Sequence, residues 1–332
     1  MSYGRFLLKR GLQGILVVWG VVSIVFMLRF ITPGSPVDAV APLDASQELR
    51  QRIAEELGLN QPLYIQYLTY LWDLLQGDMG YSYISGIEAS AMVFSKLPAT
   101  LELAIASSIV AITLSIPLGV ISATRRHAPA DYAATTFSLV GISTPNFWLG
   151  IMLILLLSVE FGLFPTSGRA FGFVEAFQLL FSDGFGAFAD AFWQWLRHII
   201  LPAVTLGTYF TALITRLTRS GMLEELGQSY IKATRAKGLP ETLVRYKHAL
   251  RNTLIPVITV LGLQLGTLIG GAVITEAVFS WPGLGTTLIN AINVRDWPIL
   301  QATLVVIGCG FVVVNIVVDA IYGYLDPQVV TE

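Results

Sequence analysis

Residues 216–251 separate two long apolar segments, and their centre, residues 229–240, reads Ser-Tyr-Ile-Lys-Ala-Thr-Arg-Ala-Lys-Gly-Leu-Pro. The stretch carries eight of the chain's twenty Lys and Arg residues against three acids. A basic segment between two apolar segments is typical of a cytoplasmic loop in a membrane protein. Its partner in the cytoplasm therefore decides what the chain does.

The local pattern predicts a rigid bent element rather than an unstructured loop. Residues 220–237 have a helical pattern, and Gly238 suits the left-handed position that follows a helix. Pro240 suits the first position of a second helix, where Glu241 lies beside the positive helix end. Because both ends continue into apolar segments, such an element can carry motion from a cytoplasmic partner into a membrane bundle.

The composition is that of a membrane protein. The chain is 54% hydrophobic and 13% charged, whereas soluble domains carry about 25% charged residues. A net charge of −2 argues against a nucleic-acid partner. The single cysteine, Cys309, lies in an apolar run, so the sequence contains no disulfide framework.

Six runs without Asp, Glu, Lys or Arg predict six transmembrane helices. Each run is near or above the ~18 residues that suggest a spanning helix, and a bilayer offers no water to an unpaired backbone. We therefore expect an all-α membrane protein without internal repeats. The runs are residues 11–28, 103–124, 132–159, 198–215, 252–275 and 297–318.

The first run has an alternative interpretation as a cleaved signal peptide. Arg5, Lys9 and Arg10 precede it, and residues 39–41, Ala-Val-Ala, resemble a cleavage site. The run is longer than the usual apolar region of about 7–15 residues, and the candidate site lies well beyond its end. The sequence therefore favours a retained helix.

The distribution of basic residues predicts the orientation in the plasma (inner) membrane. Thirteen of the twenty Lys and Arg residues fall on the side of the N-terminus, within residues 5–10, 125–126 and 216–251. By the positive-inside rule, this side is cytoplasmic. With six spans, both termini lie there.

Two segments are expected outside. Residues 33–96 contain helical patterns at 47–57 and 64–75, which predict a small cap on the outer surface. Residues 162–197 carry phenylalanines three or four apart, which favours an amphipathic helix at the membrane interface over a contact with substrate.

Two spans contain special residues. Pro145 lies within the third run and predicts a kink. In the fifth run, Gly262, Gly266 and Gly270 place one small residue per turn on one face, which permits close approach of another helix. That helix belongs either to this chain or to a second subunit.

Three acids flank the apolar runs. An ionisable group at membrane depth is a candidate functional residue, so Glu102 and Glu276, near the outer face, are weak candidates for the translocation path. Their positions at span ends favour structural roles. Asp319 lies near the inner face, where Arg125 or Arg216 is its expected partner.

The bent element resembles the coupling motif of ABC importer permeases, specifically that of the peptide/nickel branch and, within this branch, that of the dipeptide permeases. In that superfamily a Glu-Ala-Ala triplet is followed by a glycine four residues after its last alanine. Here Lys232-Ala-Thr234 occupies the triplet and Gly238 the glycine. Lys232 and Thr234 depart from the superfamily residues, but the peptide branch is relaxed at these positions. Further segments of the chain resemble signatures of this branch and follow the same order as in the branch. They are residues 57–63, 77–80, 97–103, 165–169, 248–252, 254–256, 276–285 and 319–327.

The resemblance implies the fold of a type I ABC importer permease and a set of partners. It implies a second homologous permease in a heterodimer, two cytoplasmic ATP-binding subunits and an extracytoplasmic substrate-binding protein. ATP and Mg would be bound by the partner subunits, with no cofactor in this chain. The residues that would couple to an ATPase are Tyr230, Ile231, Lys232, Ala233, Thr234, Arg235, Ala236, Lys237, Gly238 and Leu239.

The same resemblance divides the chain. Residues 1–96 would form an N-terminal helix at about 11–31 plus the cap, residues 97–324 the importer transmembrane domain, and residues 325–332 a cytoplasmic tail. Within the transmembrane domain, the helices are expected at about 101–123, 132–159, 198–216, 252–275 and 298–320.

The implied function is import of di- or oligopeptides, with nickel chelates or glutathione as alternative cargo. Other classes fit less well. A basic face lying on anionic lipid is the simplest alternative for the loop, whereas a DNA-binding helix-turn-helix is disfavoured because both its ends are tethered to the membrane. An ion-coupled carrier or channel usually has charges in the middle of its spans, which these runs lack.

No enzyme motif was found. The sequence has no His-Glu-x-x-His, no Gly-x-Ser-x-Gly and no phosphate-binding loop, which argues against an intramembrane protease and against ATP hydrolysis by this chain. The three histidines, His127, His198 and His248, are scattered, so no metal site and no catalytic residue is expected.

Overall fold

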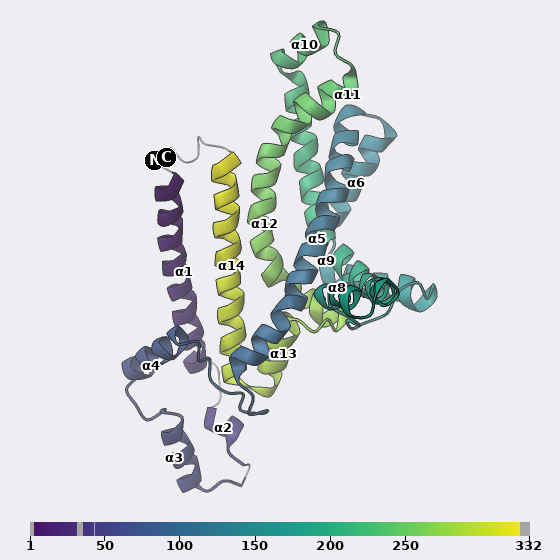
Figure 1. Ribbon diagram of the computed structural model, residues 1–332. Helices are drawn as coiled ribbons and strands as arrows, with labels where there is room; N and C mark the ends of the chain where they lie inside the picture. Colours follow the sequence, from purple (N-terminus) through teal and green to yellow (C-terminus); the bar gives the residue numbers. More distant parts are fainter. Residues whose placement is uncertain (1–2, 32–35, 43, 326–332) are drawn as a thin grey trace.

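The computed structural model describes residues 3–31, 36–42 and 44–325, and the long helices run side by side (Figure 1). In this part of the chain there is no named strand, only an isolated bridge between Tyr81 and Glu88. The predicted tail lies outside the described residues from position 326 on. The helices are α1 (Tyr3–Ile31), α2 (Pro36–Val40), α3 (Gln47–Glu56), α4 (Leu63–Leu75), α5 (Ala89–Thr124), α6 (Pro129–Ser143), α7 (Asn146–Leu153), the π-helical η1 (Ile154–Glu160), α8 (Phe173–Ser182), α9 (Phe185–Gly227), α10 (Ser229–Ala236), α11 (Glu241–Leu243), the π-helical η2 (Val244–Ala249), α12 (Leu250–Phe279), α13 (Leu284–Val294) and α14 (Trp297–Leu325).

The described helices include four that are long and apolar enough to cross a membrane, in α1, α5, α9 and α14. Two further candidates are bent pairs: Pro129–Ser143 with Asn146–Glu160, bent by 108°, and Ala272–Phe279 with Leu284–Val294, bent by 81°. If each bent pair is one span, there are up to six. The prediction of an all-helical membrane protein is confirmed.

The first bend lies where the sequence predicts a kink. α6 ends at Ser143, and Thr144 is extended, with ψ 124°. Pro145 precedes the first residue of α7. A proline disfavours the helical conformation of the residue before it and cannot donate its own backbone hydrogen bond. The direction of the chain therefore changes at this point.

The centre of the bundle is the pair α5 and α9, which pack with close backbone approach (Figure 1). A side chain at Gly119 would collide with Thr218, and one at Gly207 with the carbonyl of Ser107. Small residues at such points allow membrane helices to pack tightly without a hydrophobic driving force. α12 and α6 cover this pair, and α1 lies at the edge against α14.

The predicted cap is helical and lies at the end of the bundle opposite α10 (Figure 1). α3 and α4 occupy the two segments predicted from periodicity. Phe26 of α1 contacts Tyr67 and Tyr70 of α4, with ring centroids 5.2 and 5.5 Å apart. These contacts attach the cap to the first membrane helix.

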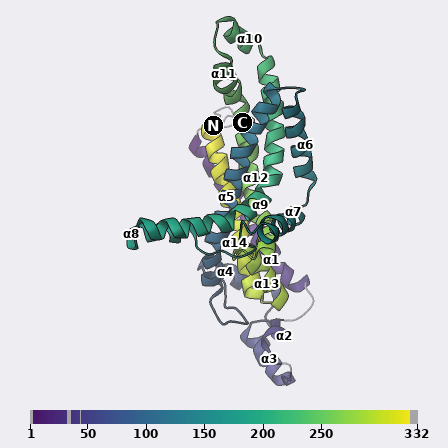
Figure 2. The ribbon, with the colours of Figure 1, turned by 90° about the vertical axis from the view of Figure 1, so that its right-hand side faces the viewer.

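The aromatic segment forms two helices rather than one. α8 ends at Ser182, and Gly184, with φ 87°, turns the chain into α9. Phe177 of α8 contacts Phe188 of α9, and Phe173 contacts Trp195. Figure 2 shows this helical hairpin projecting sideways from the bundle. The repeat of phenylalanines thus serves to pack the two helices together.

Candidate functional site

The bent element is present between α9 and α12, and its geometry corrects one detail of the prediction. The helix expected over residues 220–237 breaks at Gln228, which is extended with ψ 152°. Gly227 precedes the break, and glycine weakens a helix by about 1 kcal/mol relative to alanine. Gly238 adopts φ 75°, as predicted. Pro240 caps α11 instead of occupying its first helical position.

The inner face of α10 is anchored to the bundle. Ile231 is 0% exposed, although it lies on a helix of only eight residues. It belongs to an apolar cluster with residues of α5, α9 and η2, so a displacement of α10 must move the ends of these helices. The buried members of the cluster are Val120, Ala123, Met222, Ile231, Val244 and Ala249.

The outer face of α10 is free of such contacts. Ala233, Ala236, Lys232 and Lys237 are exposed. Two small side chains between two cations form a surface that a protein with an acidic rim can approach closely. Ala233 and Ala236 lie three residues apart and therefore share one face of the helix, and the structure leaves that face open.

Tyr230 holds the start of α10 to its neighbours. Its hydroxyl donates a hydrogen bond to Glu225 of α9 and accepts one from Asn252 of α12, at 2.9 Å. Partial burial, together with the adjacent carboxylate, raises the pKa of Tyr230. The hydroxyl therefore stays protonated and keeps its role as a donor.

An ion-pair group spans the bend. The Glu241 carboxylate accepts hydrogen bonds from Arg235 at 2.6 Å and from Arg245 at 3.1 Å. The hydrogen bond from the Arg235 guanidinium is the main cause that holds the pKa of Glu241 below its usual range. These side chains are 40–47% exposed, so their contribution to stability is small. Their effect is to connect α10 to α11.

A buried ion pair next to this element was not predicted from the sequence. Asp131, 3% exposed, accepts hydrogen bonds from Arg219 at 2.7 and 3.0 Å and from Ser122 at 2.5 Å. It joins α5, α6 and α9. The sequence shows only that Asp131 stands one residue before an uncharged run. Nothing in the sequence pairs it with Arg219, which lies 88 positions away.

The two acids proposed for a translocation path are held by internal contacts. Glu102 accepts hydrogen bonds from Arg169 at 3.0 and 3.1 Å and from the backbone N–H of Phe173 at 2.8 Å. Glu276 is 0% exposed. Its carboxylate accepts hydrogen bonds from Thr100 at 2.6 Å and from the backbone N–H groups of α13 at Gly285 and Thr286, at 2.7 and 3.2 Å.

We expect Glu276→Gln to lower the thermal unfolding midpoint of the protein in detergent. Both backbone N–H groups donate to the same carboxylate oxygen, which the amide can keep, but the amide nitrogen then replaces the oxygen that accepts from the Thr100 hydroxyl. That hydroxyl loses its acceptor, and an unsatisfied buried group costs about 1–3 kcal/mol. Glu160→Gln, at an exposed position, is the matched control, with an expected change within about 0.5 kcal/mol. Equal midpoints for the two variants would contradict the assigned role of Glu276.

The predicted partner of Asp319 is wrong. Asp319 pairs with Arg10 of α1 at 3.2 Å, not with Arg125 or Arg216. The sequence places all these cations on the same side of the membrane, and only the packing of α1 against α14 selects among them.

The three glycines of α12 have different surroundings. A side chain at Gly262 would collide with Val318 of α14, and one at Gly266 would approach Phe311 and Asn315. Gly270 has no neighbour within 4 Å among the described residues. The first two therefore pack within this chain, and the surface at Gly270 is open.

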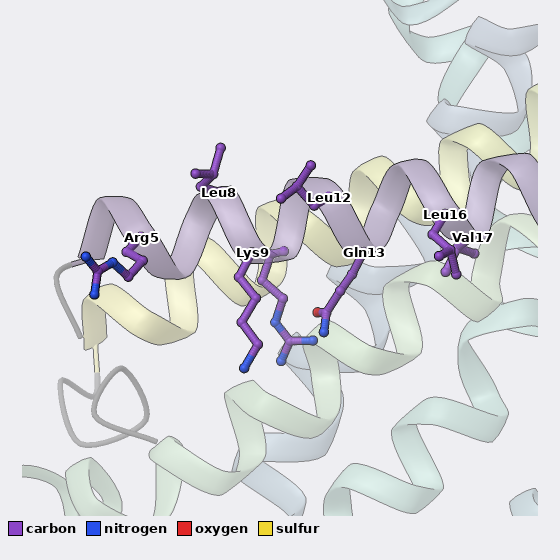
Figure 3. A pocket seen from close by; sticks show the side chains of 8 residues that line it. Arg5, Leu8, Lys9, Leu12, Gln13, Leu16 and Val17 are labelled. Carbon is purple, nitrogen blue, oxygen red and sulfur yellow. The ribbon is translucent and has the colours of Figure 1, made fainter.

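A surface depression of about 870 Å³ lies along α1 and contains no convergent polar site (Figure 3). Leu8 and Leu12 point away from Lys9 and Gln13 in this view. All of its lining residues come from one helix, so the depression is a feature of the helix surface. They are Arg5, Leu8, Lys9, Arg10, Leu12, Gln13, Leu16 and Val17.

An all-helical bundle with several helices long and apolar enough to cross a membrane defines a multi-pass membrane protein, and the short polar helix α10 is anchored at one end of this bundle. A family model described as "Binding-protein-dependent transport system inner membrane component" matches residues 115–331. A second model, for the N-terminal part of the same membrane component, matches residues 3–104. The chain belongs to this family, the permeases of ABC importers.

Curated relatives cover nearly the whole chain. The "Dipeptide transport system permease protein DppB" of Escherichia coli K12 is 40% identical over 333 residues, 98% of each chain. The "Oligopeptide transport system permease protein AppB" of Bacillus subtilis strain 168 is 39% identical over 325 residues, again 98% of each. The prediction of a transport subunit in the inner membrane, rather than an enzyme, is confirmed.

A solved structure shares the fold. The MetNI methionine ABC transporter, in an inward-facing conformation, matches with a TM-score of 0.53 and 18% identity, over 71% of this chain and 96% of that chain. At this identity the match concerns the fold alone.

Proposed function

We propose that the chain is the permease subunit of an ATP-driven, binding-protein-dependent importer of di- or oligopeptides and forms half of the translocation pathway. The observation that carries the proposal is α10, whose apolar anchor, Ile231, is buried in the bundle while Ala233 and Ala236 remain exposed. The peptide cargo rests on the two curated relatives, which transport dipeptides and oligopeptides by name.

The proposed assembly contains a second, homologous permease, two cytoplasmic ATP-binding subunits and an external binding protein. ATP and Mg would be bound by the ATP-binding subunits, and this chain would carry no cofactor. The proposal includes six spans, with both bent pairs crossing the membrane, so that both termini lie on one side; the positive-inside rule supports the cytoplasm as that side, with α10 in it. The division into residues 1–96 and 97–324 follows the same proposal, and the open surface at Gly270 is available to the second permease.

The ten proposed coupling residues have two roles. One group holds α10 in place. Ile231 and Leu239 pack against the bundle, and the Thr234 hydroxyl donates a hydrogen bond to the Ile231 carbonyl within α10. Tyr230 and Arg235 form hydrogen bonds to neighbouring elements. The remaining residues form the contact surface and the bend. They are Lys232, Ala233, Ala236, Lys237 and Gly238.

Coupling follows from this division of roles. When the ATP-binding subunits close on ATP, the surface that holds α10 moves, and the buried cluster around Ile231 transfers the displacement to α5, α9 and η2. The two conformations differ in how well they bind ATP and substrate, and that difference drives the switch. Glu102 and Glu276 stay weak candidates for the path because their carboxylates have partners within the chain.

We expect ATP hydrolysis by the assembled complex in lipid, with its binding protein, to rise several-fold on addition of dipeptides. Longer peptides, glutathione and nickel chelates are the comparison ligands, and stimulation by one of these alone would reassign the cargo. Uptake driven by an ion gradient without any ATPase would contradict the importer function and support a carrier.

A further inference from the structure

The cap helix α4 has three faces, and only one of them packs against the bundle. The packed face contacts α1 and comprises Tyr67, Tyr70, Leu71 and Leu74. A polar face, with its members one helical turn apart, comprises Gln66, Thr69 and Asp73. The third face is an apolar stripe whose side chains are 60–81% exposed, and it comprises Tyr64, Leu68, Trp72 and Leu75.

The apolar stripe distinguishes α4 from the other long helix of the cap. α3 carries five charged residues in ten positions and has no buried residue, so its whole surface suits water. α4 carries one charge in thirteen positions, Asp73, which lies on the polar face. Large exposed apolar patches on a protein mark a surface that meets another protein or a membrane. The stripe therefore needs a partner that α3 does not need.

The contacts of α4 with α1 give its depth. The hydroxyls of Ser23 and Tyr67 share a hydrogen bond at 2.6 Å, and the rings of Phe26 and Tyr67 are 5.2 Å apart. Both contacts lie inside the uncharged run of α1, residues 11–28, and the first charge after that run is Arg29. With a rise of 1.5 Å per residue, Ser23 lies about 9 Å deeper than Arg29. Helices that lie in a membrane interface bury their apolar face about 5–10 Å deep.

The orientation of α4 turns the stripe toward the membrane. Figure 1 shows α4 lying across the last turns of α1, with α3 on the far side of α4. Nε2 of Gln66 donates hydrogen bonds to two carbonyls of the segment that follows α3, at 3.2 and 2.7 Å, so the polar face points to the cap. Leu68 lies about 160° around the helix from Gln66. At the same depth α1 exposes Ile24 and Met27, as a lipid-facing helix does.

We propose that α4 is an in-plane membrane anchor, whose apolar stripe is buried among the phospholipid acyl chains of the leaflet at the cap end of the bundle. Tyr64 and Trp72 supply the aromatic rings that are enriched at membrane interfaces. The inserted helix would hold the cap at a fixed height above the lipid. The inference goes beyond the proposed function, because it depends neither on the cargo nor on the side of the membrane on which the cap lies.

The test measures the surroundings of a nitroxide label on a single cysteine in the assembled permease complex, in nanodiscs of phosphatidylethanolamine and phosphatidylglycerol. The background is Cys309→Ala, and the label is placed at Leu68→Cys or, as the matched control on exposed α3, at Gln51→Cys. Oxygen concentrates among acyl chains, whereas a neutral nickel chelate stays in water. We expect the ratio of oxygen to nickel collisions to be several-fold higher at Leu68→Cys than at Gln51→Cys.

Two results at Leu68→Cys would overturn the proposal. A ratio equal to that of Gln51→Cys would place the stripe in water. Few collisions with both reagents would show that protein covers the stripe, a second permease or the binding protein, and not lipid.

Charge substitutions test the stripe against its neighbouring face. A charged group at membrane depth is costly, so Trp72→Asp should draw α4 toward water and lower the ratio at Leu68→Cys several-fold. Thr69→Asp, on the polar face of the same helix, is the matched control and should leave the ratio unchanged. A ratio that is the same with Trp72→Asp as without it, or that falls equally in both variants, would contradict the burial of the stripe in lipid.

A measurement without substitutions serves if the labelled variants do not assemble. The unsubstituted complex is reconstituted with a phospholipid that carries a photoreactive group on its acyl chain, and the adducts are mapped by mass spectrometry. We expect adducts within residues 63–75 as well as on α1, and none on α3. Adducts on α1 without any on α4 would overturn the proposal.

Discussion

Uptake is expected to stop in the Ala233→Asp variant, while membrane insertion and folding stay normal. Ala233 is exposed on α10 and makes no buried contact within the chain, so the fold tolerates the change. At a closely packed contact with an ATP-binding subunit, however, an aspartate would be desolvated without a partner. Such a burial costs at least several kcal/mol, or more than about 100-fold in the docking equilibrium. The measurements are uptake of labelled dipeptide and the recovery of ATP-binding subunits with the purified permease.

Two further variants accompany this experiment, one as a control and one as a test of the bend. Gln51→Asp, at an exposed position of α3, is the matched control and should transport normally. Gly238→Pro tests the bend, since Gly238 has φ 75° and a proline is held near −65°. Transport at the normal rate by Ala233→Asp or by Gly238→Pro, with normal assembly, would show that α10 is not the coupling element.

Removal of the Asp131 carboxylate is expected to have the largest effect on stability. Asp131→Ala leaves the Arg219 guanidinium, 29% exposed, beside a buried hydroxyl of Ser122 and without its counter-charge. Breaking a buried pair costs about 3–5 kcal/mol, and the partial exposure of Arg219 favours the lower end of this range. The measurement is the free energy of unfolding in mixed micelles, or the unfolding midpoint.

A double-variant cycle isolates the pair. Asp131→Ala with Arg219→Met should be less destabilised than Asp131→Ala alone, because the unpaired charge is gone. Asp190→Ala, at an exposed position, is the control and should change stability by less than about 0.5 kcal/mol. If the double variant were the less stable, the Asp131–Arg219 contact would not be the source of the effect.

The sequence was most informative where one residue type dictates the backbone. The bend of 108° follows Pro145, and the left-handed turn follows Gly238. Runs without charge located the membrane helices, but not their ends. α5 begins at Ala89 and α9 at Phe185, before Lys96 and Arg197, because a charged residue ends a span without ending a helix once the chain leaves the membrane.

In the candidate site too, some features could be predicted from the sequence and others could not. The small residues Ala233 and Ala236 and the glycine after them are visible as a motif, so the contact face could be predicted. The partners of charged residues could not. Asp319 has several cations at the same depth, and Asp131 has a partner 88 positions away, so only helix packing selects between them.

By itself, the sequence determined the class of the protein, its helical content, the position of the bent element and the face that it exposes. These properties depend on local rules: apolar length, proline and glycine geometry, and the three-residue spacing on a helix. The tertiary structure alone decided that Ile231 anchors α10 against α5, that Glu276 accepts a hydrogen bond from Thr100, and that Asp131 pairs with Arg219. Those contacts join residues far apart in the chain, and their energies depend on packing that no local pattern records.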